Sequence, residues 1–149
     1  MVTVAFAELA DYRACATIDA PFRAAGVADE DLLAEPRFRE KMAHREVLVA
    51  RVGGRIVGYL SFTYIWADAW IEYIRVLEEH RRQGVGRALL VQLEAMLHAR
   101  GGKRLYSSSS ADEPPPQAWH RRMGFRDAGR LACRPDDAEG EVLFCKILG

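Results

Sequence analysis

Two glycines one residue apart follow a run of basic side chains in the stretch HRRQGVGRALL, residues 80–90. A helical pattern begins here, so the amides of Gln83 to Arg87 would belong to the donors that a helix leaves without acceptors at its start. Glycine has no Cβ, and an anion could therefore approach the backbone closely at Gly84 and Gly86. The neighbouring arginines add positive charge. The pattern predicts a phosphate or pyrophosphate site; a glycine-capped turn with a solvated basic surface is the alternative.

Two other phosphate-binding loops do not fit this stretch. A Rossmann loop would have a third glycine or an alanine at Leu89, and an acidic residue at the end of the next strand, where this chain has four serines, residues 107–110. A Walker loop needs Gly-Lys-Ser or Gly-Lys-Thr, which the sequence lacks. The serines themselves have no His and Asp pattern of a serine hydrolase.

The elements that must position this loop alternate between strands and helices. Apolar periodicity predicts strands at 2–7, 46–52, 55–66, 70–77, 103–110, 125–131 and 141–147, and helices at 8–20, 29–45, 87–100 and within 114–125. Gly53-Gly54 suits a tight hairpin turn, Gly101-Gly102 ends a helix, and Pro36 interrupts one. The order predicts an α/β fold with one mixed sheet flanked by helices.

Length and composition favour one domain over residues 1–149. A chain of this size buries about 68–70% of its unfolded surface. The 21 basic and 21 acidic side chains cancel, which argues against nucleic acid or a membrane as partner, and no apolar run approaches the roughly 18 residues of a membrane span. The three cysteines lack metal-ligand spacing and the N-terminus lacks a signal-peptide pattern. We expect a reduced, cytoplasmic protein without a metal.

Three motifs carry a resemblance to a known family. The loop at residues 81–86, Arg-Arg-Gln-Gly-Val-Gly, resembles the Arg/Gln-x-x-Gly-x-Gly/Ala pyrophosphate loop of the GNAT superfamily of acyl-CoA-dependent N-acyltransferases. The stretch IEYIRVLEEHR, residues 71–81, is similar to that family's central strand, and AWHRRMGF, residues 118–125, resembles its late helix and turn. The resemblance covers nearly the whole chain. It implies a splayed mixed sheet and a single N-acetyltransferase domain that uses acetyl-CoA as cosubstrate.

The resemblance also implies which residues hold acetyl-CoA. The pantetheine would pair with the backbone near Ile74 to Val76, and the pyrophosphate would lie on the amides of the glycine loop. The implied cofactor-binding residues are Ile74, Arg75, Val76, Arg81, Arg82, Gln83, Gly84, Val85, Gly86, Arg87 and Trp119.

Glu72 is the candidate general base for deprotonating an amine. It lies two residues before the cofactor-pairing backbone, and strand alternation places it on one face with Ile74 and Val76. Apolar neighbours such as Trp70 would raise the pKa of its carboxyl group toward neutrality. A rim carboxylate paired with an arginine is the alternative, and Asp68 is a second choice of base.

His120 occupies the position where the resembled family usually has a tyrosine that protonates the departing CoA thiolate. Three roles are open: a general acid, a residue that orients the thioester sulfur or a water by hydrogen bonding, or a residue that packs at the edge of the cleft. Arg121 and Arg122 beside it are expected to lower the imidazole pKa.

Tyr64, Trp66 and Trp70 are candidates for an acceptor pocket, although aromatic residues near a hairpin end also serve as packing. The expected function is acetyl transfer to a primary amine of a small molecule or peptide by direct attack in a ternary complex. A noncatalytic acyl-CoA-binding or sensor domain is the alternative, because the tyrosine is missing. Acidic residues at 136–141 suit a cationic acceptor or a solvated loop equally well. The sequence leaves open the acceptor's identity and the oligomeric state, a homodimer included.

Overall fold

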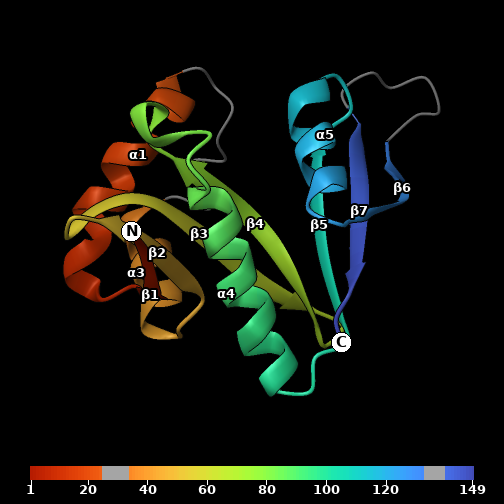
Figure 1. Cartoon of the computed structure of the whole chain (residues 1–149), viewed down its shortest axis with the longest axis horizontal. Coiled ribbons are helices and arrows are strands. Elements are labelled where there is room, and N and C mark those ends of the chain that lie inside the picture. Colours follow the sequence, from red (N-terminus) through yellow and green to blue (C-terminus); the bar gives the residue numbers. More distant parts are fainter. Residues whose placement is uncertain (25–33, 133–139) are drawn as a thin grey trace. The chain divides into compact units, whose positions relative to one another are not determined.

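The computed structural model describes residues 1–24, 34–132 and 140–149 (Figure 1). Its strands are β1 (Val2–Phe6), β2 (Val47–Val52), β3 (Arg55–Ile65), β4 (Asp68–Val76), β5 (Arg104–Ser110), β6 (Arg126–Leu131) and β7 (Glu141–Ile147). Its helices are α1 (Tyr12–Ala24), α3 (Glu35–Ala43), α4 (Val85–Ala99) and α5 (Pro114–Arg122), with short 3-10 turns η1 (Leu9–Asp11) and η2 (Glu78–His80).

The strands form one mixed sheet in the order β1-β2-β3-β4-β5-β7-β6. The β4–β5 pair is parallel, whereas β1–β2, β2–β3, β5–β7 and β6–β7 are antiparallel. The predicted α/β class and the predicted order of elements are confirmed. In the described part of the chain, no helix is long and apolar enough to cross a membrane.

Several predicted boundaries differ from the structure. The helix predicted at 8–20 is α1 at Tyr12–Ala24, and the helix predicted from 87 begins at Val85. Pro36 stands in the first turn of α3, where its missing N–H costs nothing, instead of interrupting a helix; the first residues of that predicted helix, 29–33, lie outside the described residues. β4 begins at Asp68, two residues earlier than predicted. The turn before it uses Trp66 and Ala67, both with positive φ, a conformation that glycine or asparagine normally supplies.

The chain divides into two compact units. Unit 1 comprises Met1–Phe62 and Tyr73–Leu93, and unit 2 comprises Thr63–Glu72 and Glu94–Gly149.

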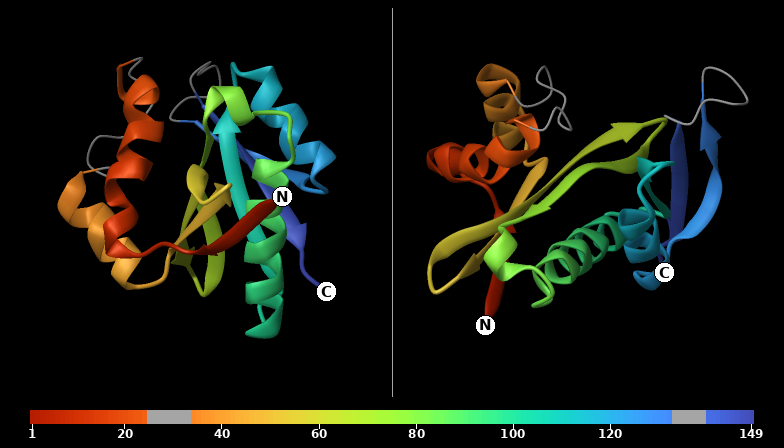
Figure 2. Two further views of the ribbon diagram at one scale, coloured as in Figure 1. Left: turned by 60° about the vertical axis from the view of Figure 1, so that its left-hand side comes forward. Right: turned by 90° about the horizontal axis from the view of Figure 1, so that it is seen from above.

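In unit 1, helices cover both faces of the sheet (Figure 2). On one face α1 and α3 bury an apolar cluster against β2 and β3, made of Ala7, Cys15, Ile18, Phe38, Met42, Val47, Val49 and Tyr59. The first part of α4 lies on the other face, where Val85, Leu89 and Leu93 are almost fully buried. The loop before α4 connects β4 and η2 to this helix.

In unit 2, α5 lies beside β5 and β7 (Figure 1). Alternation along the strands points Leu105 and Ser107 of β5 and Phe144 of β7 toward that helix, and all three are buried. The parallel ladder of β4 and β5 pairs Ala69 with Leu105. This layer positions the residues of α5.

Candidate functional site

The loop between η2 and α4 has the geometry of an anion-binding helix start. Ala88 donates the first intrahelical hydrogen bond, 2.9 Å from its nitrogen to the Gly84 oxygen. The amides of Val85, Gly86 and Arg87 therefore have no acceptor within the helix. Gly84 has φ +81°, and a Cβ built there would meet no heavy atom within 4 Å. The backbone at this point is therefore open to a ligand.

The charges around this helix start favour an anion. The first turn of α4 contains no acidic side chain, and Arg87 lies in it. A cation at a helix N-terminus opposes the helix dipole, so a bound anion would compensate both. Arg82, at the exposed tip of the turn, has φ +60°, which is unfavourable for a residue with a Cβ.

Side chains of the loop tie it to the preceding elements. The Arg81 Nε donates to the Val76 carbonyl at 3.2 Å, and the Gln83 Nε2 donates to the Glu79 carbonyl at 3.0 Å. These contacts connect the loop to β4 and η2. They fix the amides before any ligand arrives, which reduces the entropy that binding must overcome.

Gly58 of β3 allows a close approach of backbone in unit 1. A Cβ there would lie 2.9 Å from the Arg75 carbonyl oxygen and 3.1 Å from the Val85 Cγ1. A side chain at Gly58 would therefore displace β4 or the start of α4. The glycine thus sets the position of the implied pantetheine strand, residues 74–76, relative to the loop.

His120 is buried beneath α5, with 7% of its surface exposed. Its Nδ1 lies 2.7 Å from the Pro116 carbonyl oxygen, and its Nε2 lies 2.7 Å from the Ser107 Oγ. A carbonyl only accepts, so Nδ1 carries the proton and the neutral Nε2 accepts from the Ser107 hydroxyl. The ring also stacks on Phe144, with centroids 4.5 Å apart and planes 2° from parallel.

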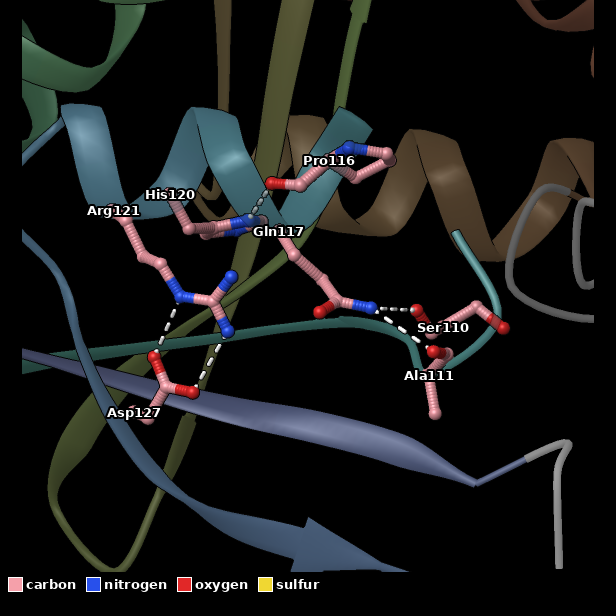
Figure 3. A network of polar contacts seen from close by, with 7 residues as sticks. All are labelled: Ser110, Ala111, Pro116, Gln117, His120, Arg121 and Asp127. Carbon is pink, nitrogen blue, oxygen red and sulfur yellow. Dashed lines mark hydrogen bonds and ion pairs between the residues drawn. The ribbon is translucent and has the colours of Figure 1, made fainter. Parts of the chain in front are cut away.

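Burial lowers the pKa of His120, and the hydrogen bond to Pro116 raises it by less. The pKa of His120 is thus lowered, as the sequence predicted. The predicted cause was wrong, because burial lowers this pKa and neither Arg121 nor Arg122 contributes to the shift. Arg121 instead pairs with Asp127 through two hydrogen bonds of 2.9 and 2.8 Å (Figure 3). These contacts raise the pKa of the Arg121 guanidinium and lower that of the Asp127 carboxyl.

Helix α5 is tied at its start as well (Figure 3). The Gln117 Nε2 donates to the carbonyl oxygens of Ser110 and Ala111, each at 3.1 Å. Trp119, the remaining predicted cofactor residue, is half-buried, and its ring meets that of His120 edge-on at 5.2 Å. The helix is thus held at both ends and its middle.

The candidate bases lie on β4 in unit 2. Glu72 is half-buried and shares a strand face with Trp70, whose ring stacks on Tyr106 at 4.7 Å. Asp68, the second choice, pairs with the Arg104 guanidinium at 3.2 Å.

The three aromatic residues predicted for an acceptor pocket have different surroundings. Tyr64 lines a cavity of about 270 Å³ together with Asp68, Arg100 and the glycines after α4. Neither Trp66 nor Trp70 lines it. Trp66 is 91% exposed at the hairpin tip, and Trp70 is engaged with Tyr106 as described.

Sequence analysis missed a buried polar pair in unit 1. The Tyr59 hydroxyl donates to the Asp19 Oδ1 at 2.5 Å, and both residues are almost fully buried. Burial raises the pKa of Asp19, while Tyr59, Arg75 and Arg23 act in the opposite direction. Burial also raises the pKa of the neighbouring Cys15 thiol to about 12.

A pattern in the sequence could have indicated this pair. Cys15, Ile18, Asp19 and Phe22 follow the i, i+3, i+4, i+7 spacing of a buried helix face, so Asp19 stands within an apolar stripe. The buried face of β5 similarly runs from Leu105 to Ser107 and Ser109, and a buried hydroxyl requires a hydrogen-bond partner. In the described ranges, no group of three or more His, Cys, Asp or Glu side chains is arranged to hold a metal ion.

Comparison with known proteins agrees with the fold. Residues 11–125 match the Acetyltransferase (GNAT) family. An uncharacterized N-acetyltransferase of Methanocaldococcus jannaschii is 29% identical over 99 residues, which cover 66% of this chain and 64% of that protein. The chain thus spans slightly less than two thirds of that relative's length.

Two solved structures extend the likeness over the whole fold. The ribosomal-protein-alanine N-acetyltransferase of Brucella melitensis has a TM-score of 0.80 at 25% identity, over 98% of this chain and 99% of that one. The PaiA N-acetyltransferase of Thermoplasma acidophilum, solved with coenzyme A, has a TM-score of 0.80 at 12% identity, over 99% of both chains.

The open mixed sheet and the amide-lined helix start define an acyltransferase fold. The chain belongs to the GNAT family of acetyltransferases.

Proposed function

We propose that residues 1–149 form an N-acetyltransferase domain that transfers the acetyl group of acetyl-CoA to a primary amine. The observation that carries this proposal is the start of α4, where open amides and a left-handed Gly84 precede a first helical turn that contains Arg87 and no acidic side chain. The pyrophosphate would accept hydrogen bonds from the amides of Val85 to Arg87. The pantetheine would run along the backbone of residues 74–76, whose position Gly58 sets.

The reaction needs orientation more than chemical groups. The neutral amine nitrogen attacks the thioester carbonyl, a C–N bond forms, and the C–S bond breaks to release CoA thiolate. Glu72 accepts the proton that the amine loses, and backbone N–H groups of β4 stabilise the oxyanion. Because a free thiol has a reference pKa of about 8.5, the CoA thiolate leaves without an obligatory general acid to protonate it.

His120 has a positioning role in this account. Both of its ring nitrogens are engaged, with Ser107 and Pro116, and its ring stacks on Phe144. It therefore holds α5 on β5 and β7 instead of protonating CoA. The free thiols of Cys15 and Cys145 fit a reducing cytoplasm as the site of action.

The contacts of His120 also favour one alternative, a noncatalytic acyl-CoA sensor. Such a protein would keep the loop but have no proton-transfer group on α5. CoA release from acetyl-CoA, measured with polyamines, aminoglycosides, amino acids and peptide N-termini, separates the two. Amine-dependent release with an acetylated product by mass spectrometry supports the enzyme. Saturable acetyl-CoA binding without amine-dependent release supports the sensor.

A further inference from the structure

Two arginines of unit 1 lie near the ring of Phe22. The Arg75 guanidinium carbon lies 4.1 Å from the Phe22 centroid and 4.6 Å from that of Tyr73, and the Arg81 guanidinium lies 5.9 Å from Phe22. Arg23 follows Phe22 on α1. Side chains from β4 and from the loop before α4 thus bring two positive charges to a ring on α1, and Arg23 acts on the same carboxylate, Asp19, as Arg75 does.

The hydrogen-bonding capacity of this cluster exceeds what its described neighbours use. The Nε atoms of Arg75 and Arg23 are buried and, over residues 1–24, 34–132 and 140–149, make no hydrogen bond. The buried carboxylate of Asp19, which interacts electrostatically with Arg75 and Arg23, accepts from Tyr59 and forms no ion pair with either arginine in those ranges. Buried guanidinium N–H groups are costly unless an acceptor binds them, so the cluster is rich in donors and poor in acceptors.

The aromatic contacts prepare Arg75 to bind an anion. A guanidinium stacked on a ring keeps its N–H groups in its own plane, directed away from the ring and free for a planar, two-oxygen acceptor. Among the described residues of this cluster, the guanidinium groups of Arg23, Arg75 and Arg81 outnumber the Asp19 carboxylate even when Asp19 is ionised. The chemistry that fits such a site is a carboxylate or phosphate.

The place of Arg75 on β4 indicates which molecule would bring the anion. Its carbonyl faces Gly58 in the strand implied for pantetheine, whereas its side chain alternates with Val76 and lies with Tyr73 on the face that α1 covers. An anion on Arg75 would thus lie one residue from the thioester path and on a different face from the α4 amides. This separation favours the amine acceptor, and not the phosphates of CoA, as the molecule that supplies the anion.

We propose that the amine acceptor carries an acidic group, a carboxylate, that binds to the Arg75 guanidinium with support from Arg23 and Arg81. This inference rests on the proposed acetyl transfer and specifies its acceptor: an amino acid, or a peptide with an acidic group near its terminal amine.

Turnover tests the inference with matched amines that differ only in that acid: glycine and glycinamide, β-alanine and β-alaninamide, and the amidated dipeptides Gly-Asp and Gly-Asn. We expect at least a tenfold higher kcat/KM for the acid member of the best pair, as hydrogen bonds to a charged group imply. In Arg75→Gln the preference should fall below about threefold through a higher KM for the acid. Arg37→Gln, on an exposed surface of α3, is the matched control and should keep the preference.

Several results would overturn the inference. Equal or better turnover of the amides, or a preference that survives Arg75→Gln in a folded protein, would exclude the acid from this cluster. A loss of acetyl-CoA affinity in Arg75→Gln as large as the loss for the acid would assign the cluster to CoA phosphates instead.

A direct binding measurement distinguishes failure of the proposed acid site from failure of the proposed acetyl transfer. N-acetylglycine and N-acetylglycinamide are titrated into CoA-loaded wild type and Arg75→Gln without any turnover. Stronger binding of the acid that depends on Arg75 upholds the acid site even if no amine is acetylated. Equal binding of both compounds in wild type overturns it even if acetylation occurs.

Discussion

Replacing His120 by alanine should destabilise the protein more than it impairs the chemistry. The change leaves the buried Ser107 hydroxyl without its acceptor, which costs about 1–3 kcal/mol. It also removes the stack on Phe144, worth about 0.5–1.5 kcal/mol, and opens a cavity under α5. The Pro116 carbonyl loses one hydrogen bond but keeps its place in the helix. We expect the free energy of unfolding to fall by about 2–5 kcal/mol.

Urea unfolding at pH 8 measures this loss. His98→Ala, on the exposed last turn of α4, is the matched control and should stay within about 0.5 kcal/mol of wild type. His120→Asn, whose amide N–H can take the place of Nδ1 and donate to Pro116, should recover part of the loss. A His120→Ala variant of unchanged stability would refute the structural role, above all if its turnover also fell about 100-fold or more.

The pH dependence of stability gives an independent check on His120. Its pKa is lowered in the folded protein, so between that value and about 6.5 the unfolded chain binds more protons. The contribution of His120 to the free energy of unfolding is therefore fully present above pH 6.5. It decreases as the pH drops toward the folded pKa, with a slope of up to about 1.4 kcal/mol per pH unit. His120→Asn should lose this part of the slope, and an unchanged slope in that variant would argue against a buried neutral imidazole.

Three further outcomes follow from the same contacts. Glu72→Gln should lower turnover at neutral pH with acetyl-CoA affinity unchanged, and the deficit in kcat should narrow as pH rises; a pH-independent deficit would point to a binding role. Tyr59→Phe should reduce the free energy of unfolding by about 1.5–3 kcal/mol, because it removes a hydrogen bond to the buried carboxylate of Asp19; urea unfolding checks this. Arg82→Ala should weaken acetyl-CoA binding at low salt and differ little from wild type at high salt, as isothermal titration would show.

Local sequence rules predicted most of the fold because the residues that set its turns and helix ends act on the backbone of adjacent residues. Gly53-Gly54 and Gly101 have the positive φ that a hairpin turn and a helix end require. The helix start at Val85 follows from the glycine loop, and its buried leucines follow from helical spacing. The connection after residue 66 was predicted, but its tight turn at Trp66-Ala67 was not, because these residues adopt positive φ without glycine.

The candidate site was less predictable because its chemistry depends on contacts between distant segments. His120 was identified by its position relative to a family motif, but only Ser107, thirteen residues earlier, explains its tautomer and burial. Arg75 was assigned through its backbone, and the contact of its side chain with Phe22 joins α1 to β4. The apolar stripe of α1 contains Asp19 as a polar exception, which the sequence shows. Its partner Tyr59, however, lies forty residues away.

The most direct test of the central claim is the affinity of acetyl-CoA for wild type and Gly86→Val, measured by isothermal titration. Gly86 lies within α4 and, unlike Gly84, is not among the glycines with positive φ, so its replacement tests access to the helix-start amides without a backbone penalty of that kind. We predict saturable binding to wild type and at least a tenfold weaker affinity in a variant that remains folded by circular dichroism. Unchanged affinity in folded Gly86→Val would contradict the placement of acetyl-CoA on this loop.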